Sequence, residues 1–389
     1  MSEWKKVKLG ELYEVHNGLS KGRQFFGTGF PFLTFSNVFN NWFLPEQLES
    51  LVQTTDKERE ACSIKAGDVF ITRTSETMDE LGMSSVALKD YPNATYNGFT
   101  KRLRPKTDRV FPRYMGYYLR TPKFRGQFMA FSSMTTRASL ANNDLLNMEV
   151  ELPSMDIQKN IATILSRYDS LIKNYQKQIK LLEEAAQRLY KEWFVDLRFP
   201  GHENTNIVDG VPEGWEKKKV DSIYSIKYGK NLSTKLITET GLFPVYGANG
   251  VIGYYDKANC NEQVVLITSR GNGSGDVLVT YHKDSFITNN SFVVTPLEGY
   301  EYCKLPFTFQ FLKMANFRAV RTGAAQPQLT NQSIHTVDVV LPNRCLIEKY
   351  CAATVRMNDA IIKYREQLRL LSEARDRLLP KLMSGEITV

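Results

Sequence analysis

The sequence has no apolar stretch that could cross a membrane, since a spanning helix needs about 18 or more consecutive apolar residues. Its first six residues, Met1 to Lys6, are largely charged or polar and contain no apolar core of the kind found in a secretory signal. From these two absences we expect a soluble protein of the cytoplasm that does not associate with membranes.

Cysteine is scarce, and the five residues present are scattered without any Cys-x-x-Cys pair. This number and spacing support neither a zinc site nor a disulfide framework. We therefore expect reduced thiols and no bound metal. The cysteines are Cys62, Cys260, Cys303, Cys345 and Cys351.

Motifs for catalysis are also missing. The chain has no Gly-x4-Gly-Lys-Ser/Thr loop for ATP and no Asn/Asp-Pro-Pro-aromatic tetrapeptide of the kind expected in an adenine methyltransferase. The glycines of residues 270–275 precede an expected strand at 276–280, whereas a dinucleotide fingerprint enters a helix. The four histidines, His16, His202, His282 and His335, have no obvious partner. A stand-alone nuclease or methyltransferase remains an alternative, but we expect no catalytic residue in this chain.

What the sequence does contain is typical of folded protein, with 42% hydrophobic and 12% aromatic residues. A chain of 389 residues is too long for one compact core, so two or three domains are expected. The net charge of +8 is compatible with a polyanionic partner. One cationic run faces a single acid, Asp108, although an ordinary solvated surface has the same composition. The run comprises Lys101, Arg102, Arg104, Lys106, Arg109, Arg113, Arg120, Lys123 and Arg125.

The chain also contains a long internal repeat. Leu152-Pro153 recurs at Leu341-Pro342, and the same offset relates the following helical segments without a gap. The openings of the two halves, at Trp4 and Trp215, are similar as well. A repeat of this length exceeds a solenoid unit and indicates a duplicated module, a globular part followed by a long helix. The matching pairs are Tyr175 and Tyr364, Gln178 and Gln367, Leu181 and Leu370, Leu182 and Leu371, Glu184 and Glu373, Ala185 and Ala374, Arg188 and Arg377, and Leu189 and Leu378.

Within each globular region, short apolar runs separated by Gly, Asn, Ser and Thr predict strands. In the first region these runs cover residues 30–35 and 68–72, and residues 112–130 are expected to form a helix. We divide the chain into a first domain at 1–152, a helix at 153–200, a linker at 201–214, a second domain at 215–341 and a second helix at 342–389.

Both helical segments carry apolar residues at alternating spacings of four and three, which is typical of a coiled-coil seam. A helix over 156–194 would be roughly 58 Å long at about 1.5 Å per residue. The second seam has polar interruptions at Thr354 and Arg375. We expect an antiparallel pair with the globular regions at opposite ends and approximate two-fold symmetry. Alternatively, each helix packs on its own domain. The predicted seam residues are Leu165, Tyr168, Ile172, Tyr175, Ile179, Leu182, Leu189, Met357, Ile361, Tyr364, Leu368, Leu371 and Leu378.

This layout resembles the specificity subunits of type I restriction-modification enzymes over essentially the whole chain. Trp4-x4-Leu9-Gly10-Glu11-Leu12 and Gly214-Trp215-x4-Val220 are similar to the starts of that family's modules. The segments 67–73 and 264–271 are similar to its strand-and-loop motif, and 149–162 is similar to its helix start. The sequence departs from the pattern at the second helix start, which lacks an equivalent of Gln158, and at 74–78, where a glycine-rich loop is common.

The resemblance implies an α+β fold with two mixed α/β target-recognition domains and two long helices as an antiparallel coiled coil. Each domain would read a few base pairs of a bipartite, asymmetric DNA site through the major groove, with half-sites about 34 Å or slightly more apart. The implied partners are double-stranded DNA, two methyltransferase subunits and two restriction-translocase subunits. S-adenosylmethionine, ATP and Mg²⁺ would belong to those partner subunits, so no cofactor is expected in this chain.

Loops rich in Lys, Arg, Ser, Thr, Asn and Gln are the candidates for DNA contact, because these side chains bind phosphates and base edges. Ordinary polar turns have a similar composition, so a coiled-coil scaffold that binds only protein remains the second interpretation. The candidates in the first domain are Lys21, Arg23, Arg73, Ser75, Lys101, Arg102, Arg104, Thr136 and Arg137. Those in the second are Lys230, Asn231, Arg270, Asn272, Asn289, Asn290, Arg321, Thr322 and Gln326.

Overall fold

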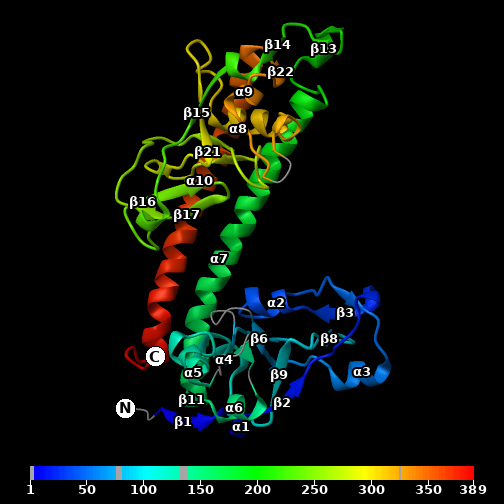
Figure 1. The fold of residues 1–389 in the computed structure, drawn as a ribbon, viewed down its shortest axis with the longest axis vertical. Coiled ribbons are helices and arrows are strands. Elements are labelled where there is room, and N and C mark those ends of the chain that lie inside the picture. The colour runs from blue at the N-terminus through cyan, green and yellow to red at the C-terminus, as the bar shows by residue number, and fades with distance from the viewer. Residues whose placement is uncertain (1–3, 76–80, 132–137, 140, 324–325) are drawn as a thin grey trace. The chain divides into compact units, whose positions relative to one another are not determined.

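A computed structural model describes residues 4–75, 81–131, 138–139, 141–323 and 326–389 of the chain (Figure 1). The chain folds into two compact units. The first unit comprises residues 1–172 together with 370–389, and the second comprises residues 173–369. Each unit therefore contains one globular region and a segment of each long helix. In the described part of the chain, no helix is both long enough and apolar enough to cross a membrane.

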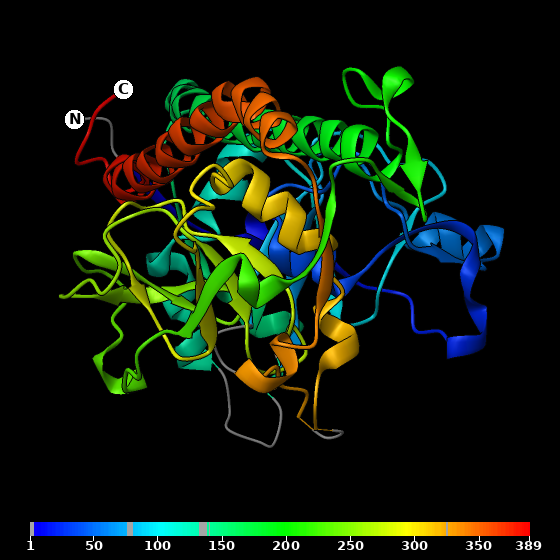
Figure 2. The ribbon, with the colours of Figure 1, turned by 90° about the horizontal axis from the view of Figure 1, so that it is seen from above.

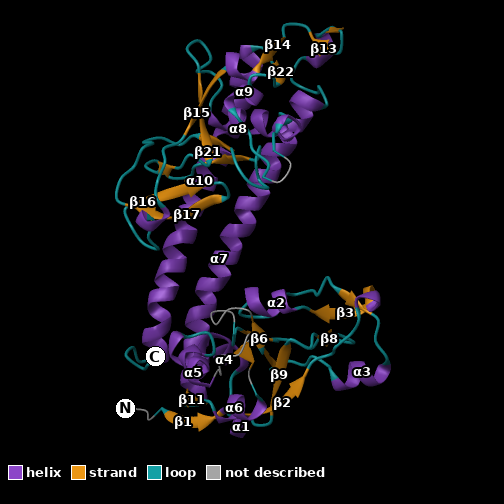
Figure 3. Ribbon diagram, in the orientation of Figure 1, coloured by secondary structure: helices purple, strands orange, loops and turns teal. Residues whose placement is uncertain are grey.

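The globular part of the first unit is built on a four-stranded antiparallel sheet in the order β2-β9-β5-β7. A smaller sheet, β4-β3-β8, lies in the same unit, and β1 pairs with β11 just before the first long helix. Figure 3 shows the helices and strands of each unit. In chain order the elements are β1 (Lys5–Lys8), α1 (Leu9–Leu12), β2 (Tyr13–Asn17), a 3-10 turn (Arg23–Phe25), β3 (Phe26–Leu33), α2 (Phe35–Asn40), β4 (Leu51–Val52), α3 (Asp56–Ala61), β5 (Val69–Thr72), β6 (Thr74–Ser75), β7 (Ser84–Val86), β8 (Thr95–Tyr96), β9 (Thr100–Pro105), α4 (Pro112–Tyr118), α5 (Pro122–Phe131), β10 (Ala138–Ser139), α6 (Asn142–Asn147) and β11 (Glu149–Leu152).

The second unit repeats this plan with a four-stranded sheet in the order β15-β21-β18-β19 and a three-stranded sheet in the order β17-β16-β20. Its β14 pairs with β22 just before the second long helix, as β1 pairs with β11. The strands and helices are β12 (Ile207–Val208), β13 (Val211–Pro212), β14 (Glu216–Lys219), β15 (Tyr224–Tyr228), β16 (Phe243–Gly247), β17 (Gly250–Tyr255), β18 (Val265–Thr268), β19 (Val277–Val279), β20 (Phe286–Ile287), β21 (Ser291–Pro296), α8 (Leu305–Met314), α9 (Asn331–Ile334) and β22 (Asp338–Leu341). Four 3-10 turns cover His202–Asn204, Val220–Ser222, Thr234–Leu236 and Phe317–Val320.

The two long helices are α7 (Met155–Tyr190), which continues as a π-helical turn through Val195, and α10 (Arg344–Met383). Within the second unit, the ring centroids of Tyr175 and Tyr364 are 5.1 Å apart. Further along α7, the carbonyl of Ala186 accepts a hydrogen bond of 3.0 Å from the Tyr350 hydroxyl, nearer the start of α10. Within the second unit the two helices therefore run antiparallel and in contact. Figure 2 shows α7 in green and α10 in orange to red. This contact confirms the predicted pairing over the alternative of two separate helices.

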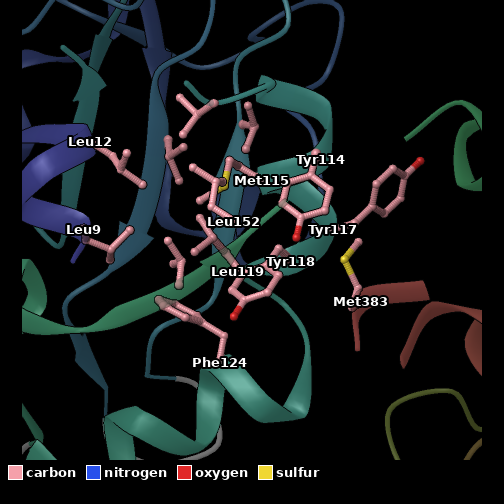
Figure 4. Packing of buried hydrophobic residues seen from close by; sticks show 14 of the residues in the cluster. Leu9, Leu12, Tyr114, Met115, Tyr117, Tyr118, Leu119, Phe124, Leu152 and Met383 are labelled. Carbon is pink, nitrogen blue, oxygen red and sulfur yellow. The ribbon is translucent and has the colours of Figure 1, made fainter. Parts of the chain in front are cut away.

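In the first unit the end of α10 completes the core of the globular region. Leu379, Leu382 and Met383 are buried in one apolar cluster with Ile161 and Leu165 of α7. Figure 4 shows Met383 of this cluster near residues of α4, whose Tyr114, Tyr117 and Tyr118 are buried. The last turns of the chain are therefore part of the first domain's core.

A polar cluster lies beside this apolar core and explains one interruption of the predicted seam. The Arg375 guanidinium donates to Asp169 of α7 at 2.9 Å, and the other oxygen of that carboxylate accepts from the Tyr117 hydroxyl at 2.5 Å. Burial raises the pKa of Tyr117 above its ordinary value, and the bond to Asp169 adds to this effect. The cluster joins α4, α7 and α10, so a shift between the helices would leave charged groups without their partners.

The helix expected at 112–130 is two helices, α4 and α5, which corrects the sequence interpretation. Pro122 has no N–H to donate and its ring clashes with a continuing helix. The Thr121 hydroxyl instead donates to the Tyr118 carbonyl at 2.7 Å and closes the end of α4. The expected linker at 201–214 likewise contains a hairpin, β12-β13, which turns at Asp209-Gly210 with φ angles of 52° and 75°. An Asp-Gly pair between apolar residues is a hairpin signal that the sequence interpretation passed over.

The two helix starts are held differently, as the missing glutamine suggests. The Gln158 side chain is buried, accepts from the Phe111 N–H at 2.8 Å and donates to the Arg109 carbonyl at 2.9 Å. Ile347, which stands at the equivalent position of α10, is fully buried in the apolar core of the second unit. Hydrogen bonds of Gln158 in one module therefore correspond to apolar packing of Ile347 in the other.

The cations of β9 stabilise the first domain rather than forming a free basic surface. Arg104 donates to both oxygens of the fully buried Asp68 carboxylate, at 2.8 and 2.6 Å. Arg102 is 3% exposed and donates to the Ser63 carbonyl at 2.6 Å. Lys101 is 4% exposed and donates to the Asn142 side chain. These contacts leave little of Lys101 and Arg102 exposed, and DNA contact by the three residues stays a prediction.

We expect Leu382→Ala to destabilise the protein by about 2–5 kcal/mol, because it opens a cavity in the core of the first unit. Leu370→Ala is the matched control on the same helix, where the side chain is 43% exposed and a change within about 0.5 kcal/mol is expected. Thermal and urea unfolding of the full chain measure both effects. Equal stabilities of the two variants would contradict the role of α10 in this core.

Arg104→Met is expected to cost about 3–5 kcal/mol of folding stability, because it leaves the buried Asp68 carboxylate without its cationic partner. The Arg104→Met, Asp68→Asn double variant removes both charges and should recover part of the loss. Urea unfolding of the wild type, both single variants and the double variant gives the coupling free energy. Additive effects of the two substitutions would show that the pair contributes nothing as a pair.

Candidate nucleic-acid interface

In the first unit the strand register gathers four connections at one edge of the main sheet. Asn17 at the end of β2 pairs with Lys101 near the start of β9. Thr72 at the end of β5 pairs with Thr100, and Ile71 pairs with Ser84 at the start of β7. The segments that follow β2 and β5 and those that precede β7 and β9 therefore all leave the sheet at the same edge. We call this the loop edge of the first unit.

The second unit has the same loop edge. Tyr228 at the end of β15 pairs with Phe292 near the start of β21, and Thr268 at the end of β18 pairs with Ser291. Ile267 pairs with Val277 at the start of β19. The equivalent four connections therefore meet at one edge here as well, although the two sequences differ in almost every loop residue.

The candidate residues of the second unit mostly lie exposed on this edge. Lys230, Asn231, Arg270 and Asn272 are exposed, and Gln326 is exposed as well. These side chains follow β15, β18 or the 3-10 turn that ends at Val320, so residues far apart in the sequence share one surface. Such a set combines cationic groups, which bind phosphates, with amides, which bind base edges.

Hydrogen bonds between the loops fix this surface. The Gly271 N–H donates to the Pro327 carbonyl at 3.0 Å, and Thr322 exchanges two backbone bonds of 2.8 Å with Gln328. Arg321 donates to the Asn272 carbonyl at 3.4 Å and to the Arg318 carbonyl at 3.1 Å. The predicted segments around 270 and 321 are therefore one assembled surface, and part of the Arg321 guanidinium serves to hold it together.

In the first unit, more of the candidate DNA-contact residues are engaged in contacts within the protein. Lys21 forms an ion pair of 2.7 Å with Glu58, and this contact lowers the pKa of the Glu58 carboxyl. Arg23 is exposed, whereas Arg73 at the end of β5 is partly buried. Burial lowers the pKa of Lys101, and the nearby charge of Arg73 acts in the same direction.

Three further candidates of the first unit cannot be placed in the same way. Thr136 and Arg137 lie outside the described residues. Ser75 belongs to the short strand β6, which pairs with β10. Lys101, Arg102 and Arg104 lie on β9, where they make the internal contacts described above.

Sequence reasoning passed over one exposed residue of the loop edge. Phe99, in the turn between β8 and β9, is 61% exposed although it is a large apolar side chain. The signal in the sequence was the Asn97-Gly98 pair, which predicts a turn and so places the following residue outside the core.

The described residues include no group of three or more His, Cys, Asp or Glu side chains arranged to hold a metal ion. A groove of about 980 Å³ in the second unit does lie beside α10, lined by residues that include Tyr246, His282, Arg365 and Glu366. Burial lowers the pKa of His282 there. This groove is not part of the loop edge.

Comparison with known proteins gives consistent results. Residues 1–184 and 212–345 match the family model described as the type I restriction modification DNA specificity domain. The chain is 25% identical to the type I restriction enzyme MjaIX specificity subunit of Methanocaldococcus jannaschii, over 100% of this chain and 94% of the relative. It is 22% identical to the HindI specificity subunit of Haemophilus influenzae, with 100% of both chains covered.

The fold is also found in a solved structure, that of the type I restriction-modification S subunit from M. genitalium. It superposes with a TM-score of 0.60 at 17% sequence identity, over 98% of this chain and 96% of that chain. The duplicated α+β modules, the shared long helices and the family match over most of the chain lead to one assignment. This chain belongs to the DNA specificity subunits of type I restriction-modification systems.

Proposed function

We propose that the loop edge of each unit is its DNA-reading surface and that the two edges read the two halves of an asymmetric, bipartite site. The observation that supports this is the repetition of one sheet edge with different exposed side chains. The connections of equivalent strands carry the exposed Arg270, Asn272 and Lys230 in the second unit, but the exposed Arg23 and Phe99 and the partly buried Arg73 in the first. Two surfaces with different chemistry would recognise different base sequences.

The long helices would set the distance between the half-sites and bind methyltransferase subunits. Apolar side chains remain exposed on both helices, including Leu171 and Leu181 on α7 and Val355 and Leu370 on α10. Exposed leucines on a helix are suited to an apolar protein interface. We expect two methyltransferase subunits and, in the full complex, two restriction-translocase subunits, acting on cellular DNA in the cytoplasm.

In this proposal the chain itself is not catalytic. S-adenosylmethionine, ATP and Mg²⁺ would be bound by the partner subunits, and this subunit would supply the sequence preference. A coiled-coil scaffold without DNA readout is the competing function, and the first experiment below separates the two.

Co-expression with the cognate methyltransferase subunit in a host without DNA methylation should produce one split methylated motif. Two defined halves with a fixed gap are expected, because each unit reads its own half. Genome-wide mapping of methylated bases measures this. A stable complex that writes no methylation would favour the scaffold function instead.

A substitution on the second loop edge should change the electrostatic part of binding. If Arg270 contacts one phosphate, Arg270→Ala makes the negative slope of log K against log salt shallower by about 0.9 and weakens binding to all sequences. The measurement is a salt titration of DNA binding by the methyltransferase complex. Lys257→Ala is the matched control. Lys257 is exposed and follows β17, whose last residue, Tyr255, pairs with Phe243 at the start of β16. An unchanged slope for Arg270→Ala would remove this residue from the phosphate contacts.

A further inference from the structure

The turn that presents Phe99 is held by hydrogen bonds to both the side chain and the carbonyl of Asn97. The Asn97 side chain donates to the Leu33 carbonyl at 3.1 Å and accepts from the Phe99 N–H at 2.9 Å. The Asn97 carbonyl accepts from the N–H and the hydroxyl of Thr100, at 3.2 and 3.0 Å. The backbone at Phe99 is therefore fixed while its ring is exposed.

The second unit builds the same turn with different residues. The Thr288 hydroxyl donates to the Tyr246 carbonyl at 3.0 Å and accepts from the Asn290 N–H at 3.4 Å. The Thr288 carbonyl accepts from the Ser291 N–H at 3.1 Å. Each bond has a counterpart in the first unit, so Asn290 is the structural equivalent of Phe99.

The neighbouring strand holds both turns in the same way. Arg73 N–H donates to the Phe99 carbonyl at 3.0 Å, and Ser269 N–H donates to the Asn290 carbonyl at 2.8 Å. These two donors follow β5 and β18 directly, at the loop edges. The tip of each turn is thus fixed beside a neighbouring connection of the loop edge that we propose faces DNA.

A glycine approaches each turn from the other side. A Cβ atom at Gly18 would lie 2.0 Å from the Asn97 carbonyl oxygen, and one at Gly229 would lie 2.4 Å from the Thr288 carbonyl oxygen. Distances this short exclude any side chain. The close approach of the β2 and β15 loops is therefore built into both modules.

The two turns share these hydrogen bonds and glycine contacts, which we call the common frame. The residues at their tips, Phe99 and Asn290, differ in chemistry. Phe99 offers an exposed apolar ring, which contributes nothing to the core of its unit. Asn290 is partly exposed, and among the described residues no hydrogen bond to its side-chain amide is found. An aromatic side chain makes apolar contact with the methyl group of thymine, whereas an asparagine amide forms two bonds with the N6 and N7 atoms of adenine.

We propose that this turn tip is a specificity-determining position in both units. Phe99 contacts a thymine methyl group in one half-site, and Asn290 pairs with an adenine in the other half-site. The proposal rests on the function given above, in which the loop edges face the major groove. It adds the residues and the base chemistry by which the two halves differ.

Modified bases test both contacts on the intact methyltransferase complex. In a duplex carrying the mapped motif, each thymine of the first half-site is replaced in turn by uracil, which lacks only the methyl group. One replacement should weaken wild-type binding about three- to fivefold, as expected for one buried methyl group. Replacing each adenine of the second half-site by 7-deazaadenine, which lacks the N7 acceptor, should weaken binding about tenfold at one position.

Variants assign these losses to the two residues. Phe99→Ala and Phe99→Asn should no longer distinguish thymine from uracil at the sensitive position, whereas Phe99→Leu keeps an apolar side chain and should still do so. Leu88→Ala is the matched control, since Leu88 is 39% exposed beyond the opposite end of β7. Asn290→Ala should lose only the response to 7-deazaadenine, and Asn206→Ala serves as its exposed control.

Different failures have different meanings. If the wild-type complex writes no split motif, the proposed function is wrong. If it writes the motif but no uracil replacement weakens binding, or if Phe99→Ala keeps the wild-type response, the contact of Phe99 with thymine is overturned. A wild-type response to 7-deazaadenine in Asn290→Ala overturns the second contact in the same way. Because both side chains are exposed or partly exposed, these substitutions are expected to leave thermal unfolding unchanged.

Discussion

The return of α10 to the core of the first unit is the contact on which the architecture depends. Leu379, Leu382 and Met383 come from the last turns of that helix, yet they are buried together with side chains of the first domain. The first module therefore lacks part of its apolar core until nearly the whole chain has been made. Because α7 and α10 each contribute to both units, the long helices are structural parts of the domains as well as the connection between them.

Apolar packing alone would leave the register of two long helices weakly defined, and the polar interruption of the seam at Arg375 supplies the missing restriction. Asp169, Arg375 and Tyr117 satisfy one another across three helices of the first unit. The other interruption, Thr354, bonds back to the Tyr350 carbonyl of its own helix at 2.8 Å and so satisfies its hydroxyl without fixing the register. Sliding α10 by one turn would separate the charged pair in a partly buried setting. The seam thus combines an apolar contribution to stability with a polar contribution to register.

The sequence predicted the long helices and the duplication well, because a coiled-coil seam is a local pattern that extends over many turns. It did not predict the internal contacts of the β9 cations, since the burial of Arg102 and the pairing of Arg104 with Asp68 depend on residues about 40 positions away. Loop composition identified segments that do lie on the loop edges, but their gathering follows from strand register, which composition does not contain. Phe99 was passed over because an apolar residue is ordinarily assigned to the core.

The two turn tips suggest how one fold accommodates different sequence preferences. The bonds that hold each turn use backbone groups and the buried side chains of Asn97, Thr100 and Thr288, and none uses the side chain at the tip. A substitution of Asn97 or Thr288 would therefore disturb the loop edge, whereas a substitution of Phe99 or Asn290 costs little folding free energy. Separating the groups that hold the turn from the group that it presents allows the recognised base to change while the domain stays folded. The same separation explains how two modules with one frame can present an aromatic ring in one case and an amide in the other.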